Sequence, residues 1–174
     1  PSGLHAIFKS MWRTIMETGD GVINFDSVKN TIGNRISWPN DDEFRKAITE
    51  QSLYGRKIAQ YVILQREESI GRETPREKFD IEHIIPKQPT AHWREILGNS
   101  PDNIVHRWGN LVPLTPWMNK EEGRRPYVKK KLAYSESMFY SPRMVCEKYD
   151  EWNPESIESR GQEIAEWALR YWRK

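Results

Sequence analysis

The chain has 174 residues, with 27 Lys and Arg against 25 Asp and Glu, so its net charge is near neutral and local charge says more about partners. This length suits one domain, or a core with a smaller helical appendage, and needs no disulfide or structural metal. The single cysteine, Cys146, excludes an internal disulfide and a cysteine-rich zinc site and fits a reducing cytoplasm. No apolar run approaches the ~18 residues of a membrane helix, and no P-loop motif occurs.

Helical spacing of apolar side chains dominates the first part of the chain, residues 1–78. It predicts a helix over residues 4–18 and, more weakly, another over 22–32. A third begins at Asn40 or Asp41, either of which is a suitable N-cap, and a fourth follows Gly55. The polar segment 71–78 contains a proline and is expected to be a connector. We predict that residues 1–78 form an N-terminal helical part.

The periodicity changes over residues 79–140. FDIEHIIP (79–86) is short, apolar and stopped by Pro86, which predicts a strand, and NLVPL (110–114) predicts a second. Between them we expect a loop with one helical turn. Thr115 followed by Pro116 is typical of a helix start, with Thr as N-cap and Pro in the first position. A second helix is predicted from about Pro126 to Tyr134.

Residues 141–174 form the predicted C-terminal helical part. The stretch 135–153 is irregular, whereas Asn153 as N-cap and Pro154 as first residue predict a terminal helix. The fold class expected for the whole chain is α+β, mostly helical, with a small strand–strand–helix core. We expect one compact domain.

Three side chains in the central segment are suited to phosphodiester hydrolysis. Glu82 and the amide of Asn119 offer the oxygen ligands that a hard cation such as Mg²⁺ or Mn²⁺ prefers. His83 is a candidate base, because imidazole titrates near neutral pH. Neighbours on a strand point to opposite faces, so Glu82 and His83 reach one site only if the strand bulges or ends there. Asn110 could orient His83, or could serve only a turn.

This order of residues resembles the HNH nuclease motif, in a variant whose last His is replaced by Asn nine positions after Asn110. More narrowly, the chain is similar to the C-terminal nuclease domain of GmrSD-type, modification-dependent restriction proteins, which SspE-like phosphorothioate-sensing defence proteins share. The resemblance rests on motifs that run from about Trp38 to the last helix. The central motifs are Glu82-His83-Ile84 with Pro86, Gly109-Asn110-Leu111 with Leu114, Asn119, Lys130-Lys131, Tyr134 and Ser137. The flanking features are WPNDDEF (38–44), Leu53-Tyr54, Tyr61-Val62-Ile63-Leu64, Ile157, Arg160 and Trp167.

The resemblance implies a ββα-metal (HNH) core that hydrolyses DNA with one Mg²⁺ or Mn²⁺ and leaves 5′-phosphate ends. It implies His83 as general base, Asn110 as the residue that orients it, and Asn119 and Glu82 as metal ligands. The implied role is nicking or cleavage of DNA in modification-dependent restriction, an anti-phage defence, in the bacterial cytoplasm. Family members carry an N-terminal nucleotide-hydrolysing, modification-sensing domain. Because the chain starts with Pro-Ser-Gly and no Met, we expect a piece of such a protein.

DNA contact is expected from the run Lys120–Lys131, where six basic residues stand against two acidic ones, a local charge of +4. Such cations neutralise phosphates without sequence preference. The candidates are Lys130, Lys129, Arg124, Arg125 and Lys120. His92 and His106 are expected on the surface or in loops, with a role for His106 in the site as the alternative.

Two other functions remain open from the sequence. One is a catalytically silent HNH-like module that binds DNA or a partner domain. The other is a nuclease directed at RNA, which competition between substrates would reveal.

Overall fold

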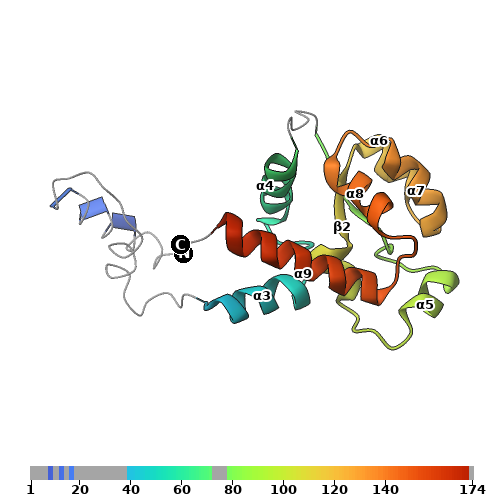
Figure 1. The fold of residues 1–174 in the computed structure, drawn as a ribbon, viewed down its shortest axis with the longest axis horizontal. Coiled ribbons are helices and arrows are strands. Elements are labelled where there is room, and N and C mark those ends of the chain that lie inside the picture. Colours follow the sequence, from blue (N-terminus) through green and yellow to red (C-terminus); the bar gives the residue numbers. More distant parts are fainter. Residues whose placement is uncertain (1–7, 10–11, 14–15, 18–38, 72–77, 173–174) are drawn as a thin grey trace. The chain divides into compact units, whose positions relative to one another are not determined.

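A computed structural model describes residues 8–9, 12–13, 16–17, 39–71 and 78–172 (Figure 1). The helices predicted over 4–18 and 22–32 lie mostly or wholly outside these residues. Asp41–Tyr171 form one compact unit, to which the description below is confined. None of the described helices is long and apolar enough to cross a membrane.

Helices make up most of this unit, and two short strands form its only sheet among the described residues. Along the chain the α-helices and strands are α3 (Asp41–Glu50), α4 (Ala59–Ile70), β1 (Asp80–His83), α5 (Ala91–Leu97), β2 (Leu111–Leu114), α6 (Pro116–Glu122), α7 (Tyr127–Ser135), α8 (Tyr140–Lys148) and α9 (Pro154–Tyr171). Two 3-10 turns, η2 (Ile104–His106) and η3 (Trp108–Asn110), precede β2. The α+β, mostly helical fold class is thereby confirmed.

The strand–strand–helix core forms as its sequence predicts. β1 pairs with β2 in antiparallel register, with Glu82 opposite Val112 and His83 opposite Leu111. The Thr115 side chain accepts a hydrogen bond from the Met118 backbone N–H at 3.4 Å, with Pro116 as the first residue of α6. This N-cap starts α6 immediately after β2, so Asn119 lies one turn into the helix.

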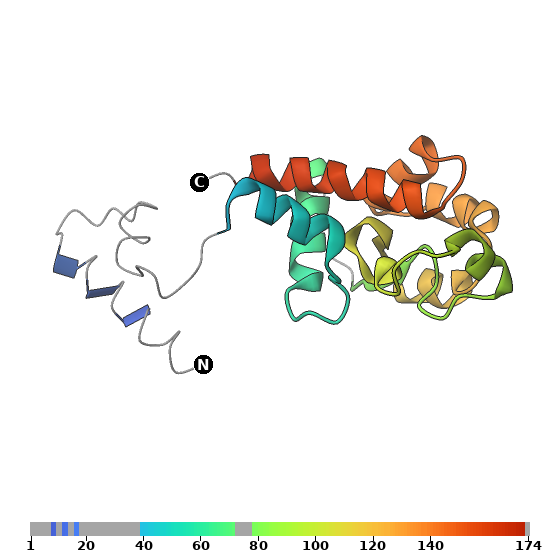
Figure 2. The same cartoon turned by 90° about the horizontal axis from the view of Figure 1, so that it is seen from below.

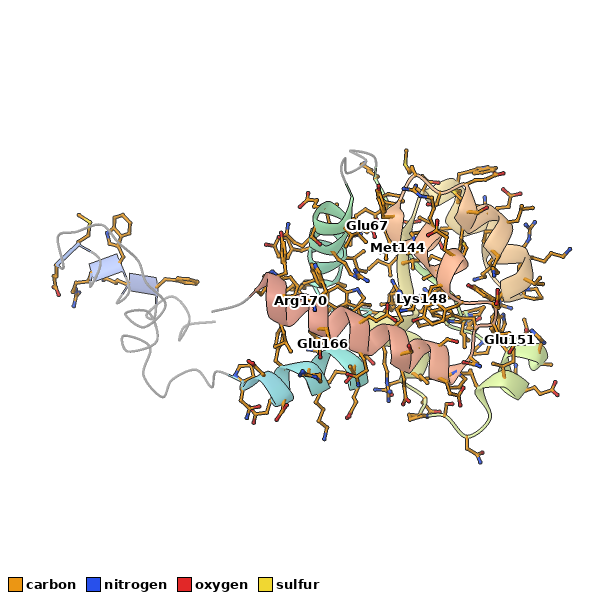
Figure 3. All side chains as sticks on the ribbon, in the orientation of Figure 1. Glu67, Met144, Lys148, Glu151, Glu166 and Arg170 are labelled. Atoms are coloured by element: carbon orange, nitrogen blue, oxygen red, sulfur yellow. The ribbon has the colours of Figure 1, made fainter. Side chains whose placement is uncertain are left out.

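Two helices differ from the prediction. α5 spans Ala91–Leu97, nearly two turns where one was expected, and α8 occupies a stretch predicted to be irregular. The backbone N–H groups of Tyr140 and Ser141 at the start of α8 donate to the carboxylate of Glu67 at 2.7 and 3.1 Å. Glu67 lies on α4, beside α8 (Figure 3). Because the cap comes from a residue more than 70 positions away, local sequence does not reveal this helix.

Helix α9 lies beside α3, as both ribbon views show (Figure 2). It also packs on η3. Arg160 on α9 is 3% exposed, and its Nη1 donates to the backbone carbonyls of Trp108, Gly109 and Leu111 at 3.1, 2.6 and 2.9 Å. Burial lowers the pKa of Arg160 to about 9, so the group stays charged at neutral pH. A Cβ on Gly109 would overlap the carbonyl oxygen of Ile157, so only glycine permits this approach. Arg160 and Gly109 together fix the turn that carries Asn110.

One hydrophobic core holds β1, β2 and the surrounding helices together. β2 is buried along its whole length, with Val112 and Leu114 at 0% exposure. Burying a large apolar side chain contributes about 1.5–3 kcal/mol, so each member of this cluster stabilises the fold. Its members are Ile84, Ile85, Trp93, Ile104, Val105, Val112, Leu114, Tyr127, Tyr134, Val145, Trp152 and Ile157.

Candidate active site

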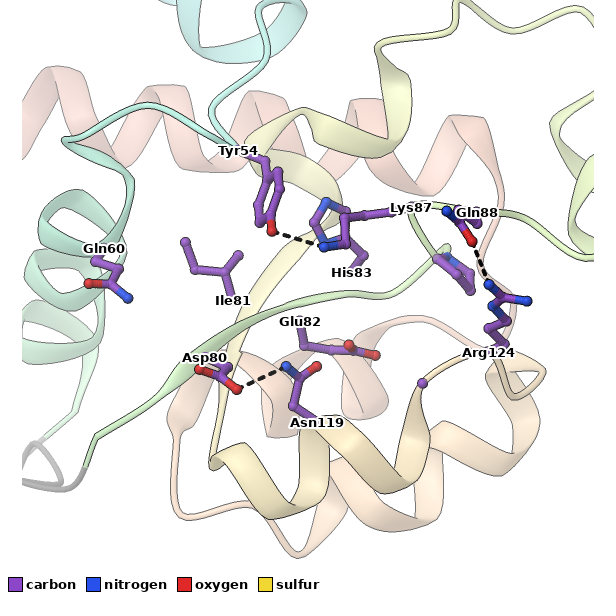
Figure 4. A pocket seen from close by; sticks show the side chains of 12 residues that line it. Tyr54, Gln60, Asp80, Ile81, Glu82, His83, Lys87, Gln88, Asn119 and Arg124 are labelled. Carbon is purple, nitrogen blue, oxygen red and sulfur yellow. Dashed lines mark hydrogen bonds between the residues drawn. The ribbon is translucent and has the colours of Figure 1, made fainter.

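A pocket of about 520 Å³ opens at the end of β1 (Figure 4). The pocket is lined by residues from β1 and the segment after it, from α6 and the turn after it, and from α4 and the loop before it. Four residues predicted for the site line it: Glu82, His83, Asn119 and Arg124. β1 ends at His83, so two neighbours in sequence reach the same pocket, as the site requires.

His83 is almost fully buried, at 4% exposure. Its Nε2 lies 3.2 Å from Nδ1 of His106, and the Tyr54 ring packs edge-on against it with centroids 4.4 Å apart. Burial is the largest cause that lowers the pKa of His83 to about 3, and electrostatic contributions from His106, Lys87 and Lys130 lower it further. The imidazole is therefore neutral at physiological pH and has a lone pair available for a proton.

The carboxylate of Glu82 forms a buried ion pair. Lys130 Nζ lies 2.5 Å from Glu82 Oε1, and the Tyr134 hydroxyl donates to the same oxygen at 3.0 Å. Lys130 also donates to the backbone carbonyl of His83 at 3.0 Å. Burial raises the pKa of Glu82 and lowers that of Lys130, and each partner opposes the shift of the other. Lys130 has 0% exposure and no surface to offer a phosphate, which corrects the prediction that it contacts DNA.

Asp80 and Asn119 meet at the open side of the pocket. Asn119 Nδ2 lies 3.4 Å from Asp80 Oδ2, and both side chains line the pocket together with Glu82 (Figure 4). Asp80 precedes Glu82 by two positions on β1, so the two carboxylates point to the same face. Among the described residues no group of three or more His, Cys, Asp or Glu side chains could hold a metal ion. A cation here would therefore need the amide oxygen of Asn119 as well as the carboxylates.

Asn110 uses both ends of its amide within the protein. Its Oδ1 accepts from the Ile85 backbone N–H at 2.9 Å and from Trp152 Nε1 at 3.0 Å. Its Nδ2 donates to the carbonyls of Ile85 and Val105 at 2.9 and 2.8 Å. Asn110 thus does not touch the His83 ring. It joins the segment after β1 to the turn that carries His106.

The basic residues predicted to contact DNA differ in their surroundings. Arg124 lines the pocket, where Nη2 lies 2.5 Å from Gln88 Oε1. Lys120 and Lys129 are exposed, and Arg125 is exposed but paired with Glu122 at 3.0 Å. Arg124, Lys120 and Lys129 are therefore accessible to a phosphate backbone, and Arg125 is partly neutralised.

Sequence reasoning missed four residues around the pocket: Tyr54, Asp80, Lys87 and, as more than an alternative, His106. Asp80 has a signal in the sequence, since FDIEH places two acids two positions apart on a strand. Lys87 follows the EHIIP motif directly, and its Nζ donates to the Tyr54 hydroxyl at 2.9 Å. Tyr54 lies in the connection before α4 and His106 in the connection before β2, and no local sequence pattern predicts a role for either residue.

The match to one family extends across this whole arrangement. The family model described as the C-terminal domain of GmrSD restriction endonucleases matches residues 38–167, which include every pocket residue. A comparison with curated proteins finds no match. The match spans well over half the chain and points to a nuclease with a restriction function. The chain therefore belongs to the family of C-terminal domains of GmrSD restriction endonucleases.

Proposed function

We propose that this chain is a metal-dependent DNA endonuclease with a single hydrolytic site at the end of β1. The observation that carries the proposal is the convergence in one pocket of a neutral histidine, His83, with the oxygen donors Asp80, Glu82 and Asn119. Phosphodiester hydrolysis needs a base that takes a proton from water and a positive charge beside the phosphate. The histidine can act as the base, and the oxygen donors can hold a cation that supplies the positive charge.

In this proposal His83 takes a proton from a water molecule. The resulting hydroxide oxygen attacks phosphorus while the bond from phosphorus to the 3′-oxygen breaks. The products are a 5′-phosphate end and a 3′-oxyanion, which takes a proton from solvent to become a 3′-hydroxyl. A pKa of about 3 makes His83 a weak base in the free protein. The phosphate brought beside the ring is negatively charged, and an adjacent negative charge raises the pKa of an imidazole. The phosphate would thus oppose the lowering of the His83 pKa by the positive groups around it.

The donor set fits a hard divalent cation, Mg²⁺ or Mn²⁺. Asp80, the Asn119 amide oxygen and the second oxygen of Glu82 would hold it, since Lys130 and Tyr134 both bond to Oε1. Such ions keep several waters and use few protein ligands when phosphate oxygens are present. When bound, the cation would neutralise charge on the phosphate and on the leaving oxygen. Lys130 and Tyr134 would keep the Glu82 carboxylate in place.

Four cations would hold the DNA backbone. Lys87 and Arg124 line the pocket, and Lys120 and Lys129 are exposed along α6 and α7. Each phosphate neutralised by such a cation adds about 0.9 to the slope of log affinity against log salt concentration. Replacing Lys87 by Gln should reduce this slope by about one.

The biological setting that we propose is modification-dependent restriction in a bacterial cytoplasm. The domain that senses the modification and hydrolyses nucleotide would be a separate part of the full-length protein. A single hydrolytic site would cut one strand at a time, so nicking is the expected outcome for this chain alone.

Cleavage of supercoiled plasmid tests the proposal. Wild type, His83→Ala and the matched control His92→Ala would each be incubated with Mn²⁺, Mg²⁺ or EDTA. His92 is exposed on α5 and lies away from the pocket. We expect open circles with a metal ion only, a loss of roughly 10²- to 10⁴-fold in His83→Ala, and no change in the control. Equal activity in all three proteins would contradict the site. Gel shift without cleavage would favour the DNA-binding module instead.

A further inference from the structure

The ring of His83 makes a polar contact with the ring of a second histidine, His106. His83 Nε2 and His106 Nδ1 are 3.2 Å apart, and the two rings are perpendicular, with centroids 5.4 Å apart. The Nδ1 atom of His83 has no hydrogen bond within the described residues. The hydrogen bond between the rings therefore decides which nitrogen of His83 carries a proton.

His106 is held on several sides. Its backbone carbonyl accepts from the N–H groups of Leu53 and Tyr54 at 2.9 and 3.1 Å. The Tyr54 ring stacks on His106, with centroids 5.7 Å apart and planes 19° apart, while its edge meets His83. Asn110 holds the carbonyl of the preceding residue, Val105. His106 is thus a fixed partner and not a mobile surface side chain.

Only one direction of this hydrogen bond leaves His83 able to act as a base. If His106 donated, the Nε2 lone pair of His83 would be used and its Nδ1 would carry the proton, so neither nitrogen could accept. If His83 donates from Nε2, its Nδ1 keeps a lone pair. His106 must then be the neutral form that carries its proton on Nε2.

We propose that His106 is a positioning residue for His83. Its Nδ1 accepts the Nε2–H of His83 and so fixes the tautomer whose Nδ1 takes the proton from the attacking water. Tyr54 supports this pair by packing against both rings. The inference rests on the proposed nuclease function, and it gives the η2 turn and the loop before α4 a part in catalysis.

Two substitutions at His106 separate the hydrogen bond from ring packing. His106→Phe keeps a ring to stack on Tyr54 but has no acceptor. His106→Asn loses the ring but places an amide oxygen at about the position of Nδ1. His92→Phe is the matched control, because it makes the same replacement on a histidine outside the pocket. Each variant would be measured for kcat and KM on supercoiled plasmid with Mn²⁺, and for thermal stability.

We expect His106→Phe to lower kcat roughly 10- to 100-fold with little change in KM, as for other residues that orient a catalytic group. His106→Asn should recover most of that loss. His106→Phe with wild-type kcat, or His106→Asn as inactive as His106→Phe, would overturn the proposal. The proposal would also be overturned if both His106 variants lost the same kcat and the same thermal stability, because lost ring packing alone would then explain the effect.

Nitrogen-15 NMR of the histidine rings reads the tautomer without any need for activity. Above neutral pH we expect His83 to carry its proton on Nε2 and His106 to show an unprotonated, hydrogen-bonded Nδ1. A proton on Nδ1 of His83 would overturn the inference even in an active enzyme. If wild type fails to cleave, the nuclease proposal fails, while the NMR result still decides the direction of the hydrogen bond.

Discussion

Replacing Lys130 by Met should destabilise the protein without acting through DNA. Lys130 has 0% exposure, and its ammonium group lies 2.5 Å from a Glu82 carboxylate that is 4% exposed. Met keeps most of the side-chain volume but removes the cation, which leaves a carboxylate in the interior without its counter-charge. Breaking a buried pair costs about 3–5 kcal/mol. Because the Tyr134 hydroxyl still donates to the same oxygen, we expect the lower end, about 3 kcal/mol.

Urea and thermal unfolding, followed by tryptophan fluorescence, would measure this loss. For a chain of this size about 3 kcal/mol corresponds to a fall in Tm of about 6–12 °C. The double variant Lys130→Met with Glu82→Gln should be more stable than Lys130→Met alone, because no charge is then left unpaired. Lys129→Met is the matched control, since Lys129 is the exposed neighbour and should change stability by less than about 0.5 kcal/mol.

The opposite pattern would refute the reasoning. If Lys130→Met unfolded like wild type but bound DNA more weakly and with a smaller salt slope, Lys130 would be a surface contact to phosphate. A double variant no more stable than Lys130→Met would likewise show that the ion pair with Glu82 does not account for the loss.

Three further predictions concern packing, pH and metal. Gly109→Ala should lower the free energy of unfolding by about 3 kcal/mol in urea titration, because its Cβ would overlap the Ile157 carbonyl, and an unchanged midpoint would contradict this. The pKa of His83 falls from 6.5 to about 3 on folding, so between these pH values the unfolded state binds a proton that the folded state does not. The free energy of unfolding should therefore fall as the pH is lowered from about 6.5 towards 3, by up to roughly 1.4 kcal/mol per pH unit. His83→Leu should remove this component of the pH dependence. Asp80→Ala should raise the Mn²⁺ concentration for half-maximal plasmid cleavage roughly 10-fold, and an unaltered metal requirement would exclude Asp80 from the metal site.

Local sequence predicts the helices whose N-cap residues lie next to them in the chain. Thr115 and Pro116 start α6, and Asn153 starts α9, where its Oδ1 accepts from the Ser156 N–H at 2.9 Å. Each of these caps lies next to the helix that it begins. Helix α8 shows the limit, because its first N–H groups are capped by Glu67 from another helix. A periodicity search within the stretch 135–153 has no access to that contact.

The candidate site likewise contains residues that the sequence motif predicts and residues that only tertiary packing brings there. The sequence motif identifies Glu82, His83 and Asn119, since their spacing follows from two paired strands and one helix. It misassigns Lys130, because a lysine in a basic run reads as a surface cation and only tertiary packing turns it inward. His106 lies 23 positions from His83, in a turn with no regular pattern, so its contact appears only in three dimensions.

The contacts of Arg160 bear on how small this nuclease can be made. Its three hydrogen bonds join α9 to the turn that carries Asn110 and to the first residue of β2. A fragment limited to residues 79–140 would contain both strands and the pocket's acidic side chains. It would lose Arg160 together with the buried side chains Ile157 and Ile164 of α9, at about 1.5–3 kcal/mol for each large apolar side chain. The candidate site and α9 should therefore fold as one unit and be kept together in any engineered fragment.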